Sequence, residues 1–203
     1  MFVRRSSVSI AALVLGVALV AHADGPAVAQ ARHDALLMKQ KVAAITAYAG
    51  RPSPRPRLTT VTERELNAYL ALEIGSELPA GVVDPSISIL GTGRLSGRAV
   101  VDLDAVRRQK QPTSLLDPMS YLTGRLPLTA SGILTTARGV GRFELESASV
   151  AGVPIPKPML QQIVSYYSRS PESPSGISLD NPFPLPAHIR EIQVQRGQAV
   201  VVQ

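Results

Sequence analysis

The segment DPSISILGTGRLSGRAVVDLDAV, residues 84–106, decides the fold, because apolar residues begin here to recur at every second position. Ile87 and Ile89 alternate with serines, and after Gly-Thr-Gly the apolar series continues at positions 99, 101, 103 and 105. This spacing predicts strands with one apolar face, the second strand reaching residue 106. The glycines at 91, 93 and 97 predict turns, bulges or bends in long strands.

Strand patterns continue toward the C-terminus. Apolar residues at 126, 128 and 130 share a face, and residues 139–151 again alternate. KPMLQQIVSYYSRS, residues 157–170, predicts a helix over 158–168 with one apolar side. Residues 188–203 predict a closing hairpin that turns at Arg196-Gly197.

Two helices are predicted before the strands, over residues 32–49 and from Thr62 onward, where Thr62 and Glu65 have capping-box spacing. RPSPRPR at 51–57 is too rich in proline for a helix or a paired strand and predicts an exposed connector. The predicted class is α+β: a strongly curved antiparallel sheet wrapped around a helix, with the N-terminal helices packed on it.

The first 23 residues have the anatomy of a secretory signal peptide: Arg4 and Arg5, an apolar run over 10–21, and Ala21-His22-Ala23. We therefore expect residues 1–23 to be removed, by a Sec or a Tat route, and residues 24–203 to form one domain in the periplasm or outside the cell. Removal of two arginines lowers the net charge from +6 to +4. This charge fits peripheral contact with an anionic membrane or an envelope protein, whereas dispersed basic residues and few aromatic ones do not fit nucleic acid.

The patterns of catalysis are missing. The chain has no cysteine, only His33 and His188 after the leader, and no H-E-x-x-H, G-x-S-x-G or G-K-[ST] motif. Two carboxylate pairs, at 102 and 104 and at 144 and 146, have the spacing of one strand face. They fit either a cation or glycoside-hydrolase site or the solvated face of a sheet, and the alternation favours the solvated face. We expect no enzyme activity, no cofactor and no metal.

Abundant aliphatic residues and long bending strands instead suggest an apolar groove between the 158–168 helix and the sheet. Each buried methylene of a lipid is worth about 0.8 kcal/mol. Two arginines, Arg94 and Arg98, are the candidates for the head group at the mouth of the groove. The candidate groove residues are Val101, Leu103, Phe143, Leu145, Leu160, Ile163, Val164 and Tyr167.

Four phrases carry a family resemblance: VTERELNAYL at 61–70, the segment at 84–106, FELESASVAGVPIPKPMLQQIV at 143–164 and FPLPAHIREIQVQRGQAVVVQ at 183–203. Together they resemble small secreted bacterial proteins related to the tubular lipid-binding (TULIP-like) superfamily. The resemblance implies a curved antiparallel sheet around a helix, lipid or amphiphile binding, and no catalysis.

The sequence therefore predicts an exported protein that binds or shuttles a lipid or other amphiphile. The alternative is an envelope scaffold with a dry core, whose partner is a protein. A continuous internal cavity would distinguish the two.

Overall fold

The computed structural model describes residues 25–50, 55–75, 77–78, 81–109, 123–167, 174–176 and 178–203. The expected signal peptide and most of the 51–57 connector lie outside these ranges. The described elements are α1 (Pro26–Ala49), β1 (Leu58–Thr62), α2 (Glu63–Leu72), β2 (Val82–Gly91), β3 (Arg94–Asp102), α3 (Leu103–Gln109), β4 (Arg125–Ala137), β5 (Val140–Val150), β6 (Val153–Pro154), α4 (Lys157–Tyr167), β7 (Phe183–Pro184), β8 (Glu191–Gln195) and β9 (Gln198–Val202).

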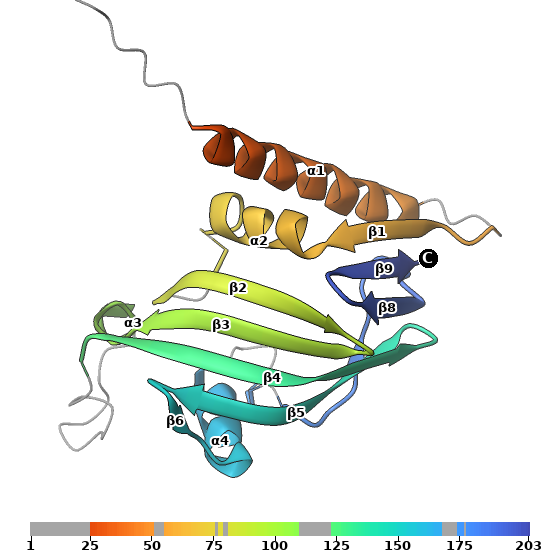
Figure 1. The fold of residues 1–203 in the computed structure, drawn as a ribbon. Helices are drawn as coiled ribbons and strands as arrows, with labels where there is room; N and C mark the ends of the chain where they lie inside the picture. The colour runs from red at the N-terminus through yellow and green to blue at the C-terminus, as the bar shows by residue number, and fades with distance from the viewer. Residues whose placement is uncertain are drawn as a thin grey trace, which may run out of the picture.

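The larger sheet has the order β2-β3-β4-β5-β6, and β7 pairs with the far end of β5. Every pairing is antiparallel, and the long strands follow one another through short turns. Figure 1 shows these strands sweeping across the molecule as an open, curved ribbon, with α1 and α2 on one side and α4 beside β5. The α+β class and the antiparallel sheet predicted from the sequence are confirmed.

A second, three-stranded sheet has the order β1-β9-β8 and includes the predicted terminal hairpin. Its core consists of Ile45 from α1, Ile189 and Val201, all buried. The buried side chain of Gln203 donates from Nε2 to the carbonyls of Ile45 and Ala187 at 2.9 and 2.6 Å. This side chain therefore holds the end of α1 against the chain segment that enters β8.

Helix α2 covers the outer edge of the larger sheet. The predicted capping box is present: Thr62 Oγ1 accepts from the Glu65 amide, and Glu65 Oε2 accepts from the Thr62 amide. One turn later, the Asn67 amide group donates to the carbonyl of Ile87 and accepts from its N–H at 2.8 and 2.7 Å. Glu63 Oε2 accepts from the N–H of Ile89 at 2.6 Å. These bonds satisfy backbone groups that an edge strand otherwise leaves open.

The predicted strand over 99–106 ends earlier than expected. Strand β3 ends at Asp102, and Leu103 begins helix α3. The reason is local: Asp102 Oδ1 accepts from the Ala105 amide at 2.9 Å, as an N-cap side chain does. The alternation continues through 106 but is overridden by this cap.

Candidate functional site

Strand register gives the larger sheet one apolar face. Residues directly opposite one another in an antiparallel pair project to the same face. Leu95 of β3 lies opposite Ile89 of β2 and Gly132 of β4, and Gly132 lies opposite Leu145 of β5. The rows on either side carry the same pattern. We use the name "apolar face" for the side formed by Ile87, Ile89, Leu95, Gly97, Ala99, Val101, Leu126, Leu128, Ala130, Leu134, Phe143, Leu145, Ala148 and Val150.

The protein's own residues do not fully cover the apolar face. Of its side chains only Ile89 and Ala148 are buried, at 3% and 7% exposure, and the other non-glycine residues are half-buried. At the centre of the face, a Cβ built on Gly97 meets no described atom within 4 Å. By contrast, a Cβ on Gly132 would lie 2.6 Å from Cζ of Phe143, whose ring occupies that space. The described part of the chain therefore leaves open space beside Gly97 on this face.

The dimensions of the apolar face suit an elongated ligand. The row at Leu95 and the row at Val101 are six residues apart along β3. At about 3.3 Å per residue this separation is about 20 Å. The face is therefore long enough to lie along an acyl chain of ordinary length.

The structure distributes the predicted groove residues over several elements. Val101, Phe143 and Leu145 lie on the apolar face, half-buried. Leu103 is in α3 rather than in β3. On α4, which packs beside β5, Leu160 is buried at 6% exposure and Val164 is half-buried. The side chains of Ile163 and Tyr167 lie outside the described part of the structure.

The predicted head-group residues project away from these apolar side chains. Arg94 and Arg98 occupy the alternate positions of β3, and both are exposed. Arg94 forms two hydrogen bonds with Glu146, at 2.9 and 2.7 Å, on the polar face of the sheet. We therefore leave both arginines out of the proposed site, because the sheet separates them from the apolar face.

Asp102 and Asp104 have structural roles. Asp102 and Asp104 do not share a strand face, because Asp104 lies in the first turn of α3. The Ala105 amide and then the Arg125 guanidinium lower the pKa of Asp102, with a 3.3 Å contact to Arg125. Asp104 accepts from the Gly124 amide at 3.2 Å. In the described ranges, no cluster of three or more His, Asp or Glu has the arrangement of a metal site.

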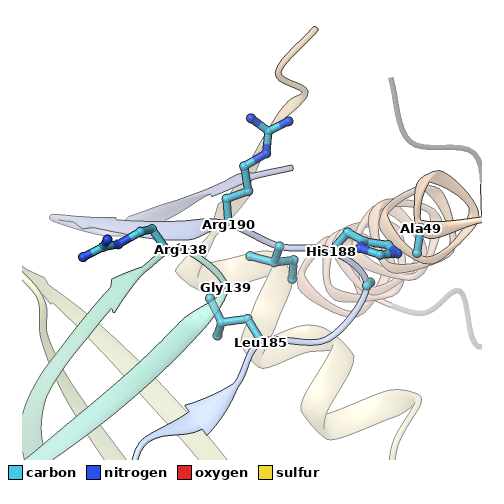
Figure 2. Close-up of a pocket in the computed structure, with 8 residues that line it drawn as sticks. Ala49, Arg138, Gly139, Leu185, His188 and Arg190 are labelled. Carbon is cyan, nitrogen blue, oxygen red and sulfur yellow. The ribbon is translucent and has the colours of Figure 1, made fainter. Parts of the chain in front are cut away.

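A pocket of about 490 Å³ lies where the two sheets and the end of α1 meet. Its wall combines the turn between β4 and β5 with the segment that enters β8 (Figure 2). The lining residues are Ala49, Arg138, Gly139, Leu185, Ala187, His188, Ile189 and Arg190. The sequence analysis did not predict this pocket, because its walls come from three segments that are distant in the chain.

The pocket wall is held by backbone hydrogen bonds in an unusual conformation. Arg138, Ala187 and His188 have positive φ angles of 49°, 53° and 54°, a region that residues other than glycine rarely adopt. The Gly139 amide donates to the Arg190 carbonyl at 2.9 Å, and the Gly139 carbonyl accepts from the Leu185 amide at 2.7 Å. The two loops are therefore bonded to each other across the pocket.

The pocket and the apolar face adjoin at Gly141. Leu185 lines the pocket, and its Cδ2 lies 3.3 Å from a Cβ built on Gly141. The ring of Phe183 lies 2.7 Å from the same position and is 41% exposed. Gly141 is two residues from Phe143 on β5, so a Cβ there would project to the apolar face. Apolar side chains therefore lead from the pocket onto that face.

Comparisons with known proteins give little information about this chain. No family model matches the chain, and no curated protein matches it. One similar solved structure is that of a lipopolysaccharide binding protein, at 17% identity and a TM-score of 0.22. The match covers 72% of this chain and 40% of that one, so the chain spans well under half of its length. A likeness this distant carries no argument about function.

The search for membrane-spanning helices, made over the described residues, finds none with the length and hydropathy that crossing a bilayer requires.

Proposed function

We propose that the protein is an exported, non-catalytic binder or carrier of a lipid-like amphiphile, whose hydrocarbon part lies along the apolar face. The observation that carries the proposal is the open space beside Gly97, in the middle of a face whose apolar side chains are mostly half-buried. A dry core places such side chains in contact with one another. Here the centre of the face has space instead.

The energy of burial favours an aliphatic ligand on this surface. About ten methylenes moved from water onto the apolar face would contribute about 8 kcal/mol before the entropy losses of binding. The face supplies aliphatic residues and the ring of Phe143, without a carboxylate among them. A hydrocarbon chain needs no polar partner, so this surface is chemically suited to it. The expected signal peptide supports a role in the cell envelope.

The experiment places a bulky side chain in the open space beside Gly97. Gly97 does not have a positive φ, and a Cβ built there meets open space, so Gly97→Phe directs a ring into that space. The matched control is Arg98→Phe, which puts the same ring on the next residue and hence on the opposite face. Uptake of a dansyl-labelled undecanoic acid is followed by fluorescence, and native mass spectrometry of protein purified from cells reports any co-purified amphiphile.

We expect the wild type and Arg98→Phe to bind the labelled fatty acid and Gly97→Phe to bind at least tenfold more weakly, with an unchanged or raised melting temperature. Equal binding by Gly97→Phe and the wild type would place the ligand elsewhere. Wild-type protein that neither binds the probe nor carries any amphiphile would refute the proposal and leave the scaffold alternative.

A further inference from the structure

The pocket beside the apolar face is lined by basic side chains and by no acidic ones. Three of its eight lining residues, Arg138, His188 and Arg190, carry basic side chains, and none of the eight is acidic. Within the described part of the chain, none of these three side chains forms an ion pair or a side-chain hydrogen bond. Figure 2 shows the three side chains extending in different directions, Arg138 from the β4–β5 turn and His188 and Arg190 from the segment before β8. Elsewhere on the sheet Arg94 and Arg125 have carboxylate partners.

Like charges gathered around one cavity repel each other, and an anion between them removes that repulsion. Arginine suits this role because its planar guanidinium donates two parallel hydrogen bonds to a carboxylate or a phosphate. The backbone hydrogen bonds between Gly139 and residues 185 and 190 hold the loops together. The backbone positions of Arg138 and Arg190 are therefore fixed, and only their side chains need to reorient.

We propose that this pocket binds the anionic head group, a carboxylate or phosphate, of the amphiphile whose chain lies on the apolar face. The inference rests on the proposed function and adds the ligand class: an anionic rather than a neutral amphiphile. The geometry supports the connection, because Leu185 lines the pocket and also packs at Gly141, where the apolar face begins. A ligand with its head between Arg138 and Arg190 therefore has an apolar path past Phe183 for its chain.

The test compares two ligands with the same chain, dodecyl phosphate and the neutral dodecyl maltoside, by calorimetry below their micelle concentrations. The wild type is expected to bind dodecyl phosphate at least tenfold more tightly, since hydrogen bonds to charged groups are the strong ones. The double variant Arg138→Gln with Arg190→Gln is expected to lose this preference and to keep its affinity for dodecyl maltoside. Inorganic phosphate, which lacks the chain, is expected to compete only weakly, which separates a lipid head group from a free-phosphate site.

The control is Arg94→Gln with Arg98→Gln, which changes the net charge equally on the opposite face and is expected to preserve the preference. An equal loss in both double variants would show that only long-range charge matters and would overturn the pocket assignment. Equal affinity of the wild type for both amphiphiles would overturn the head-group inference while leaving the proposed function intact. If neither amphiphile binds, both proposals fail together.

Discussion

The contact between Asn67 and the edge strand β2 gives the sharpest test of the fold. The Asn67 side chain forms two hydrogen bonds with the backbone of Ile87, at 2.8 and 2.7 Å. Glu63, one helical turn earlier, bonds the amide of Ile89 at 2.6 Å. Four residues of helix advance about 6 Å and two residues of strand about 6.6 Å, so the two spacings match. The change Asn67→Ala removes the Ile87 half of this arrangement.

The expected loss of folding free energy follows from the number of hydrogen bonds removed. Two intramolecular hydrogen bonds contribute about 2 kcal/mol together. Alanine is a better helix former than asparagine by about 0.5 kcal/mol, which reduces the net loss to about 1.5 kcal/mol. For a chain of this size that loss corresponds to a fall of about 3–6 °C in the melting temperature.

Urea denaturation measures the global change, and amide hydrogen exchange measures the local one. We expect a lower urea midpoint with an unchanged slope, and faster exchange of the Ile87 amide than of amides within the β3–β4 ladder. Concentration-dependent self-association is a further expected sign, because the variant has an unprotected strand edge. A stability change below about 0.5 kcal/mol together with unchanged exchange at Ile87 would refute the role assigned to α2.

Three other changes test separate parts of the structure. Burial raises the pKa of Glu65, but hydrogen bonds from Lys41 and from Thr62 outweigh it, so the pKa falls below the ordinary 4.5. Its ionised form therefore stabilises the fold at neutral pH. At pH 7 we expect Glu65→Gln to be less stable than the wild type by about 2 kcal/mol, and this difference should shrink as the pH drops through the folded-state pKa. A difference that stays constant with pH in urea titrations would contradict this. Gly132→Ala places a Cβ 2.3 Å from the Glu144 carbonyl oxygen and should cost about 3 kcal/mol or more by thermal unfolding, whereas Gly97→Ala should be neutral or stabilising; equal melting temperatures would argue against the packing described. Gln203→Ala removes two hydrogen bonds from a buried side chain and should lower the free energy of unfolding by about 2 kcal/mol in urea, and a wild-type midpoint would show that these bonds contribute nothing.

Local signals in the sequence were enough to predict most elements. The alternation after residue 84 predicted antiparallel strands, and the spacing of Thr62 and Glu65 predicted the start of α2. The helix expected over 158–168 is α4, and the expected terminal hairpin is β8–β9. These features depend on residues close together in the chain, where propensity and periodicity act directly.

The end of strand β3 was predicted wrongly, for a local reason as well. The apolar alternation through residue 106 indicated a strand, and Asp102 instead caps a helix that begins at Leu103. One side-chain hydrogen bond at the helix N-cap therefore outweighed the strand-like alternation of the four residues 103–106. The expected signal peptide lies outside the described residues and stays a prediction.

Only the tertiary structure decided how the apolar face is covered and where the pocket lies. The sequence placed Phe143 and Val101 on apolar strand faces, but the open space at Gly97 depends on what packs over the sheet. The pocket brings together Ala49, residues 138–139, Leu185 and residues 187–190, and backbone hydrogen bonds join residue 139 to residues 185 and 190. Periodicity fixes which way a side chain points within its own element. Packing between elements fixes what that side chain meets, and here it leaves a half-buried apolar face beside a pocket lined by basic residues.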